Sequence, residues 1–312
     1  MKRILVSMFF FALLLVNTSA IYAANPVAHP ILRHVIPWHM KAGFSINSVA
    51  AVDNATALGI NTAIIYGTPY YPADPVGAEM LAKGLHEVDG GLASDLYYYE
   101  CHRTHTVALP PSGQPNTYCA TDEEPAMNSE NALLAAIDTH LQADAANPLI
   151  FGYWVLDDWA IWDSGSAKLV LQAVHAQIQN YTPSYPAICG LGVAIDKPGI
   201  SDWIPGLALN YSNSGCDRVG IYSYISSYAI YMDGSQFDFT LKAGLSAVLA
   251  SLRQQGWNIQ NTPLLGIGQA FAGTYATTNY EPGITVAQMQ TEATAFCQAG
   301  ANSIGWYGWS DS

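Results

Sequence analysis

The chain has 312 residues and an acidic composition, with 24 acidic residues against 11 basic ones and a formal net charge of −13. This charge argues against nucleic acid and other polyanions as partners. Only 11% of the residues are charged, whereas 19 tyrosines and 8 tryptophans are present. Such a composition favours neutral ligands that stack on aromatic rings.

The first 24 residues are typical of a secretory signal peptide. Lys2 and Arg3 precede an apolar run over residues 8–16, and small residues follow at Ala20 and Ala24. The run is too short for a membrane anchor, which needs roughly 20 apolar residues. We therefore expect a secreted or extracytoplasmic protein that has no contact with a membrane once the signal is removed.

An apolar strand-like run, a polar loop and an amphipathic helix recur along the mature chain, residues 25–312. The predicted strands are 34–38, 62–66, 96–100, 150–158, 187–192, 218–224, 264–269 and 303–309. The clearest predicted helices are 48–58, 130–142, 167–179, 241–255 and 286–299. This alternation predicts a single-domain α/β fold, a (β/α)8 TIM barrel. No eighth helix follows the last predicted strand. Either residues 25–33 cover that gap, or the sequence is a truncated reading of a longer chain, which is the interpretation we favour.

The cysteines predict disulfides, because an exported chain meets an oxidising environment. Cys101 and Cys119 flank a segment rich in Pro, Ser, Gly and Asn, where a disulfide would hold a long loop. Cys189 lies on a predicted strand and Cys216 just before the next one, so they form the second expected pair. Cys297, on a predicted helix, is then left over, and we expect it to be buried.

The segment 152–159, Gly-Tyr-Trp-Val-Leu-Asp-Asp-Trp, carries the most information about function. An apolar strand that ends in acids is how a parallel barrel presents its chemistry at the mouth. Neighbouring residues in a strand point to opposite faces, so only one of Asp157 and Asp158 is expected to face the barrel axis. The other would orient a neighbour or cap the next helix. Tryptophans beside these acids indicate a sugar site.

Three segments, 57–62, 152–159 and 305–309, resemble those of secreted (β/α)8 glycoside hydrolases. The resemblance implies an acid/base carboxylate at the end of the fourth strand, which Asp158 matches, and a nucleophilic carboxylate at the end of the seventh. The seventh predicted strand ends in Gln269 and has no acid. The partner carboxylate is therefore sought elsewhere: Glu100, at the end of the predicted third strand, comes first, and Asp311, after the eighth, comes second.

Glycoside hydrolysis needs one protonated and one ionised carboxyl group. Two acids held close together among tryptophans have pKa values that are driven apart, as this division of labour requires. The expected function is cleavage of glycosidic bonds in a neutral or weakly charged polysaccharide or oligosaccharide, with Asp158 as general acid. The alternative is a non-catalytic barrel that binds glycans, which the missing acid on the seventh strand favours.

Residues near predicted strand ends that can stack on a sugar or hydrogen-bond to it complete the candidate site. They are His39, Tyr66, Trp154, Trp159, Tyr222, Tyr224, Gln269, Trp306 and Trp309. A rival metal site at residues 100–105 has two histidines three positions apart next to Glu100 and Cys101. That spacing is common and the thiol is assigned to a disulfide, so we expect neither a metal nor a cofactor. We expect a monomer.

Overall fold

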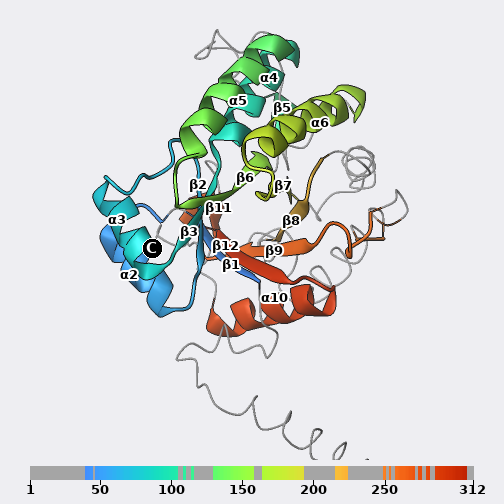
Figure 1. Ribbon diagram of the computed structural model, residues 1–312. Helices are drawn as coiled ribbons and strands as arrows, with labels where there is room; N and C mark the ends of the chain where they lie inside the picture. The colour runs from blue at the N-terminus through green and yellow to red at the C-terminus, as the bar shows by residue number, and fades with distance from the viewer. Residues whose placement is uncertain are drawn as a thin grey trace, which may run out of the picture.

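The computed structural model places a closed barrel at the centre of the chain (Figure 1). It describes residues 39–44, 46–104, 108–109, 114–115, 129–157, 164–192, 215–223, 249–250, 253, 257–270, 273–275, 279–281 and 285–307. All statements below concern these residues.

Eight parallel strands form the barrel, in the order β1-β12-β9-β8-β7-β6-β3-β2. In chain order they are β1 (Met40–Phe44), β2 (Thr62–Ile65), β3 (His86–Asp89), β6 (Ile150–Leu156), β7 (Ala187–Gly192), β8 (Arg218–Ser223), β9 (Leu264–Gln269) and β12 (Ser303–Tyr307). Every neighbouring pair is parallel, including the closing pair of β1 and β12. The predicted (β/α)8 barrel is confirmed.

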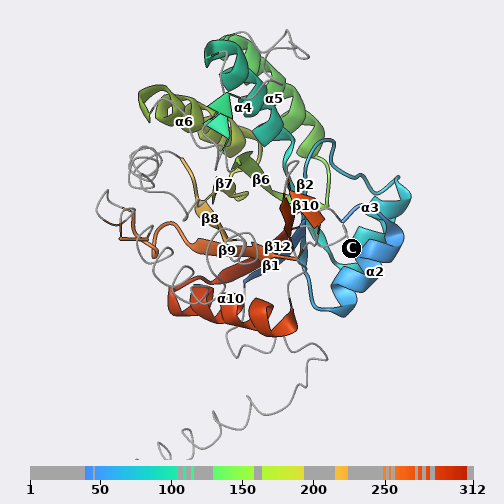
Figure 2. The same ribbon diagram turned by 180° about the vertical axis from the view of Figure 1, so that it is seen from behind.

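Helices between the strands pack around the barrel, as the two opposite views show (Figure 1, Figure 2). They are α2 (Val49–Ala57), α3 (Pro75–Lys83), α4 (Gly91–Thr104), α5 (Glu130–Asp144), α6 (Ser164–Tyr181) and α10 (Val286–Gln298). Two short antiparallel pairs add β4 (Ala108–Leu109) with β5 (Gln114–Pro115), and β10 (Gly273–Tyr275) with β11 (Asn279–Glu281). Within the described ranges, no helix is long and apolar enough to span a bilayer.

Local sequence chemistry explains where several helices begin and end. Ser48 and Ser129 cap α2 and α5 by accepting a hydrogen bond from a backbone N–H of the first turn. Thr285 and Gln288 form a reciprocal capping box at the start of α10. Gly84 ends α3 in the left-handed region, with φ of 67°, which glycine adopts without steric cost.

The third barrel strand differs from the prediction. Residues 96–100, expected to form it, lie within helix α4, and β3 comprises His86–Asp89 instead. The run of tyrosines at 97–99 favours a strand by propensity, but tertiary packing of α4 overrides that preference. The predicted first strand, 34–38, and most of the predicted helix 241–255 lie outside the described residues.

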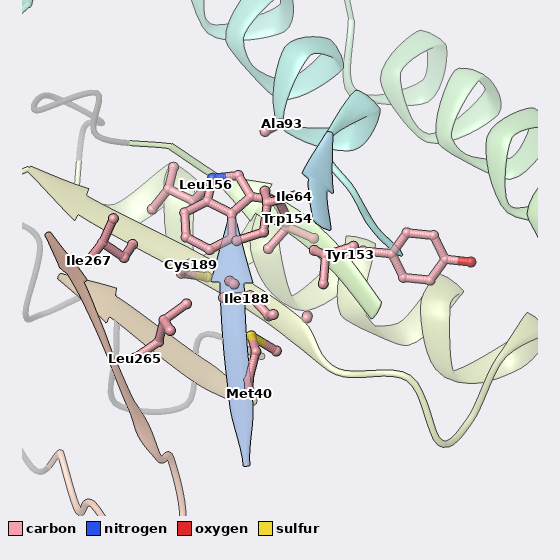
Figure 3. Packing of buried hydrophobic residues seen from close by; sticks show 14 of the residues in the cluster. Met40, Ile64, Ala93, Tyr153, Trp154, Leu156, Ile188, Cys189, Leu265 and Ile267 are labelled. Carbon is pink, nitrogen blue, oxygen red and sulfur yellow. The ribbon is translucent and has the colours of Figure 1, made fainter. Parts of the chain in front are cut away.

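The barrel interior is filled by the indole of Trp154, which is fully buried. Figure 3 shows Trp154 and its neighbour Tyr153 pointing to opposite sides of β6. Glycines on the adjoining strands make room for the indole: a Cβ at Gly190 would overlap the ring, and one at Gly220 would lie 2.8 Å from it. The ring edge packs at 90° on Phe44, with centroids 5.7 Å apart. These two glycines are therefore required by the size of one side chain.

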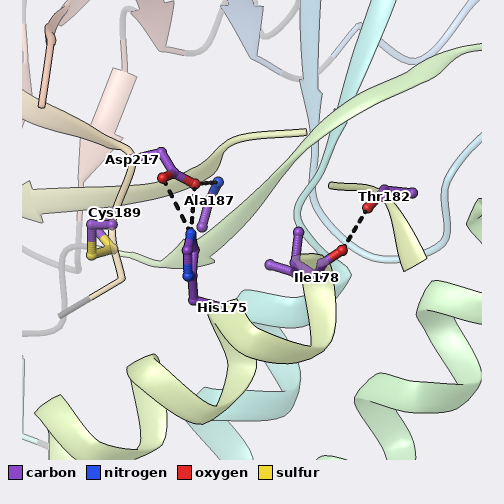
Figure 4. Close-up of polar contacts among 7 residues, drawn as sticks. His175, Ile178, Thr182, Ala187, Cys189 and Asp217 are labelled. Atoms are coloured by element: carbon purple, nitrogen blue, oxygen red, sulfur yellow. Dashed lines mark hydrogen bonds and ion pairs between the residues drawn. A yellow bond between two sulfur atoms is a disulfide. The ribbon is translucent and has the colours of Figure 1, made fainter. Parts of the chain in front are cut away.

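A disulfide joins Cys189 on β7 to Cys216 just before β8, with Cα atoms 5.8 Å apart. The same end of the two strands is held by His175 of α6, whose Nε2 lies 3.1 Å from Asp217 Oδ2 (Figure 4). That oxygen also accepts a hydrogen bond from the Ala187 amide. The expected disulfide between Cys189 and Cys216 is confirmed.

The other cysteine assignments have different outcomes. Cys297 has a free thiol and lies on α10 as expected, but it is half-buried rather than buried. Cys101 lies at the end of α4. Its expected partner, Cys119, lies outside the described residues, so that pairing stays a prediction.

Removing the Cys189–Cys216 disulfide should lower the free energy of unfolding by about 3.5 kcal/mol, because the bond closes a loop with a sequence separation of 27. The double variant Cys189→Ala/Cys216→Ala, compared with the unreduced protein in urea titrations, measures this loss. Cys297→Ala serves as the control, and its free energy of unfolding should lie within about 1 kcal/mol of the parent value. Equal midpoints for the double variant and the parent would contradict the prediction.

Candidate functional site

Five aromatic rings, contributed by five different barrel strands or strand ends, gather at the carboxyl end of the barrel. They are Phe44, Tyr66, Trp154, Tyr222 and Tyr307, and we call them the mouth cluster. Phe44 lies at the centre: its ring centroid is 5.3 Å from that of Tyr307, 6.0 Å from Tyr66 and 6.1 Å from Tyr222. In barrels of this kind the carboxyl end is where chemistry takes place.

One carboxylate, Asp157, lies against this cluster directly after β6. The Tyr222 hydroxyl donates to Asp157 Oδ1 at 2.7 Å, and the Trp154 indole N–H donates to the same oxygen at 3.3 Å. The Tyr66 hydroxyl lies 3.3 Å from that oxygen and 2.8 Å from the Tyr222 hydroxyl. Residues from β2, β6 and β8 thus converge on a single carboxylate oxygen, which is an acceptor for charge-assisted hydrogen bonds.

A shift in strand register explains why Asp157 points to the mouth. Regular alternation from Trp154 would put Leu156 and the following Asp158 on the inner face. The pairing of β6 with β7, however, shifts between Trp154 and Leu156, since Trp154 pairs with Ile188 and Leu156 with Cys189. A bulge of this kind re-aims the side chains that follow it. Sequence alternation left the choice between the two acids open, and the register shift brings Asp157 to the rings.

Two of the site residues predicted from the sequence do not lie at the carboxyl end of the barrel strands. Glu100 lies on helix α4 and not at the end of a barrel strand, so its proposed position beside the fourth strand was wrong. His39 precedes β1, with its amide bonded to the carbonyl of Asn302 ahead of β12. It therefore lies at the amino end of the barrel, opposite the mouth, and the prediction failed because the first strand was placed too early.

The remaining candidates divide into four groups. Tyr66, Trp154 and Tyr222 meet around Asp157, as described above. Trp306 is buried on the outer side of the sheet, because a Cβ at Gly268 would lie 2.5 Å both from its ring and from Glu292 of α10. Gln269 ends β9. Asp158, Trp159, Tyr224, Trp309 and Asp311 lie outside the described residues, and their roles stay predictions.

Two members of the mouth cluster were missed from the sequence. Tyr307 lies between Trp306 and Gly308 in a segment already selected as a strand end, and alternation would have placed it on the face opposite Trp306. Phe44 ends β1. The apolar and small residues within 40–44 indicate this strand. They were overlooked because the first strand was predicted at residues 34–38 instead.

A second group of acids lies buried outside the barrel, between β3 and the helices that cover it. Glu87 and Asp89 share one face of β3, and Asp144 ends α5; all three side chains are nearly inaccessible. We call them the outer acid cluster. Both Glu87 oxygens accept from the Tyr70 amide, at 3.3 and 3.2 Å, and Asp89 Oδ1 accepts from the Gly91 amide at 2.8 Å.

Burial raises the pKa values of the carboxyl groups in this cluster. Desolvation raises the pKa of Glu87 to about 9 and, with the nearby charge of Asp89, raises the pKa of Asp144 to about 8. Desolvation also raises the pKa of Asp89. In the described part of the chain no donor reaches either oxygen of Asp144. Its carboxyl faces that of Asp89, and two carboxyl groups bond only when one of them carries a proton.

The cluster has one basic neighbour in the described ranges, His140, whose Nδ1 lies 3.0 Å from Asp95 Oδ2. The bond to Asp95 raises the pKa of His140 above its usual value. No group of three or more His, Cys, Asp or Glu side chains in the described residues is arranged to hold a metal ion. Within the outer acid cluster, the Asp89 and Asp144 carboxyl groups connect β3 to α5.

Comparisons with known proteins support the fold. No protein-family model matches the chain, and no curated protein matches it. Solved β-glucuronidases match in structure: the apo enzyme from Ruminococcus gnavus with a TM-score of 0.52 at 11% identity, and that from Lactobacillus rhamnosus with 0.51 at 12%. Each match covers 87% of this chain and 43% of the other, so the chain spans less than half the length of these enzymes. At this identity the likeness shows the barrel that these glycoside hydrolases share.

Proposed function

We propose that this protein is a secreted glycoside hydrolase whose reaction takes place at the mouth cluster, with Asp157 as one of the two carboxyl groups. The observation that carries the proposal is the position of Asp157: a carboxylate at the carboxyl end of the fourth barrel strand, bonded to Tyr222 and Trp154 and surrounded by aromatic rings. Hydrolysis of a glycosidic bond needs a carboxyl pair, and stacking on rings is a common way to hold a sugar.

The second carboxyl group is proposed from the sequence. Asp158 follows Asp157 directly, and Asp311 follows the eighth strand. Glu100 is no longer a candidate, because helix α4 carries it away from a strand end. The expected substrate is a neutral or weakly charged glycan, in keeping with a chain of net charge −13 that would repel a strongly anionic polymer. The Cys189–Cys216 disulfide is compatible with the proposed export to an oxidising compartment.

Loss of activity on removal of Asp157 tests the proposal. Purified mature protein is assayed on polysaccharides and on aryl glycosides of the common hexoses, of xylose, of N-acetylglucosamine and of glucuronic acid, in both anomers. We expect hydrolysis of at least one, and a loss of about 10²-fold or more in kcat/KM for Asp157→Asn and for Asp158→Asn. Asp53→Asn, an exposed acid on α2, is the matched control and should keep parental activity. No hydrolysis of any glycoside by the parent protein would refute the proposal.

A second candidate function is glycan binding without chemistry. The feature that favours it is the end of β9, where the seventh barrel strand ends in Gln269 rather than in an acid. Titration calorimetry with the same polysaccharides separates the two functions. If the barrel only binds glycans, the parent protein will bind a polysaccharide and release no reducing ends from it. If it is a hydrolase, the parent protein will release reducing ends and the Asp157→Asn variant will not.

A further inference from the structure

The hydrogen bonds at the mouth distinguish between the two roles that a carboxyl group can have in glycoside hydrolysis. One group gives a proton to the departing oxygen, and the other is ionised and faces the anomeric carbon. Sequence resemblance assigns the acid/base role to the end of the fourth strand. The contacts of Asp157 point to the other role.

Asp157 Oδ1 is an acceptor in every contact that reaches it from the mouth cluster. The Trp154 N–H can only donate, and it is directed at this oxygen. The Tyr222 hydroxyl donates to it at 2.7 Å, the length of a charge-assisted bond. The Tyr66 hydroxyl lies close enough to Asp157 Oδ1 and to the Tyr222 hydroxyl oxygen to donate to either of them. Donors directed at a carboxyl oxygen stabilise the charged form of the group.

The environment of Asp157 contrasts with that of the outer acid cluster in the same molecule. Neither oxygen of Asp144 meets a donor in the described residues, and the carboxyl opposite it is another acid. The surroundings of Asp144 thus favour its protonated form, whereas the donors around Asp157 favour its ionised form. The described residues therefore show two kinds of carboxyl environment, and the one rich in donors lies at the mouth.

Resting on the proposed function, we propose that Asp157 is the ionised carboxylate that faces the anomeric carbon, and that Tyr222 is the positioning residue that keeps it ionised. In the bond-breaking step a separate carboxylic acid transfers its proton to the leaving oxygen. The electrons of the bond between that oxygen and the anomeric carbon stay with the oxygen. The Asp157 carboxylate balances the positive charge that develops on the sugar ring and forms a bond to the anomeric carbon. Water, which gives a proton to the other carboxylate, then replaces Asp157 on that carbon and releases the sugar.

Rescue by azide distinguishes this role from that of a proton donor. The Asp157→Ala variant is assayed on the 2,4-dinitrophenyl glycoside of the sugar that the parent protein hydrolyses, with and without sodium azide. We expect kcat/KM to fall by about 10²-fold or more even with this good leaving group. A good leaving group compensates for a missing proton donor, whereas this variant lacks the ionised carboxylate. Azide should restore turnover by entering where the carboxylate was, giving a glycosyl azide with the anomeric configuration opposite to that of the substrate.

The pH profile of Tyr222→Phe tests the positioning role. Loss of one hydrogen-bond donor destabilises the ionised form of Asp157 and raises its pKa. The acidic limb of the kcat/KM profile should therefore move to higher pH by about one unit. Tyr181→Phe is the matched control: its hydroxyl donates to Asp138 at 2.6 Å on the surface helices, away from the mouth. The control profile should coincide with that of the parent. This measurement also covers the case in which Asp157→Ala does not fold.

The outcomes separate the two proposals. An active parent protein whose Asp157→Ala variant keeps turnover on the dinitrophenyl glycoside, or yields an azide product of unchanged configuration, overturns the ionised role and leaves the hydrolase function standing. An unmoved acidic limb in Tyr222→Phe overturns the positioning role. A parent protein that hydrolyses no glycoside refutes the hydrolase function, and the assignment of Asp157 falls with it.

Discussion

Trp154→Ala should lower the free energy of unfolding by about 4 kcal/mol, within the range for removing a large buried ring. The indole is fully buried inside the barrel, and the positions that face it on β7 and β8 are Gly190 and Gly220, which have no side chain to fill its place. The variant also loses the N–H that donates to Asp157. Urea titration followed by far-ultraviolet circular dichroism measures the loss. Trp154→Phe, which keeps a ring, should lose markedly less.

A double-mutant cycle with Gly190→Ala tests the packing explanation. In the parent protein the added methyl overlaps the indole and should cost about 1–3 kcal/mol, as overpacking does. In the Trp154→Ala background the same methyl enters the vacated space and should cost little or nothing. Additive costs for the two substitutions would mean that the glycine has another role.

The free energy of unfolding should fall as the pH rises from about 5 to above 9, by an amount on the order of 5 kcal/mol. The cause is the outer acid cluster. The pKa of Glu87 is raised from 4.5 to about 9, and that of Asp144 from 3.8 to about 8. Between these limits the unfolded chain has released protons that the folded chain still holds. Stability from the cluster is therefore complete below the unfolded pKa values and is lost as the pH passes 8 to 9.

Urea titrations at pH 5, 7 and 9.5 measure this dependence. Glu87→Gln and Asp144→Asn replace a protonated acid by a neutral group of the same shape, so each should flatten the alkaline decline while costing little at pH 5. Asp53→Asn is the control, because the bond to Lys83 lowers the pKa of this exposed acid and it stays ionised across the range. A decline of equal size in Glu87→Gln, Asp144→Asn and the control would assign the effect to the general negative charge of the chain.

The parts of the fold that could be predicted are those in which burial and residue type agree. Residues 150–156 and 264–269 are apolar on both faces, as strands of a covered parallel sheet are, and both were placed correctly. The capping residues Ser48 and Ser129 likewise agree with the helices that they begin. Sequence reasoning works in these places because the local and the global preferences are the same.

The strand β3 was missed because two of its four residues, Glu87 and Asp89, are acids. A sequence pattern treats acids as charged and exposed, whereas these are buried. The neighbouring helix α4 did carry a readable signal: Leu92, Leu96 and Tyr99, all buried, recur at helical spacing. The aromatic run at 97–99 outweighed that signal. The error then moved Glu100 to a strand end that does not exist.

The candidate site was predicted in composition more than in geometry. Tyr66, Trp154, Tyr222 and the acid pair were named from the sequence, because strand ends of a barrel converge at one mouth. Which of the two acids meets the rings was not predictable, since alternation assumes an unbroken strand. A register shift depends on how β6 pairs with β7, and that pairing is set by residues far apart in the chain.

The register shift in β6 also changes how the chain should be aligned with other barrels. Counting from Trp154 along a regular strand would align Asp158 with the inward-facing acid of another barrel. Because of the bulge, the inward-facing acid in this chain is Asp157, one position earlier. An alignment without a gap at this point would therefore pair residues that face opposite ways.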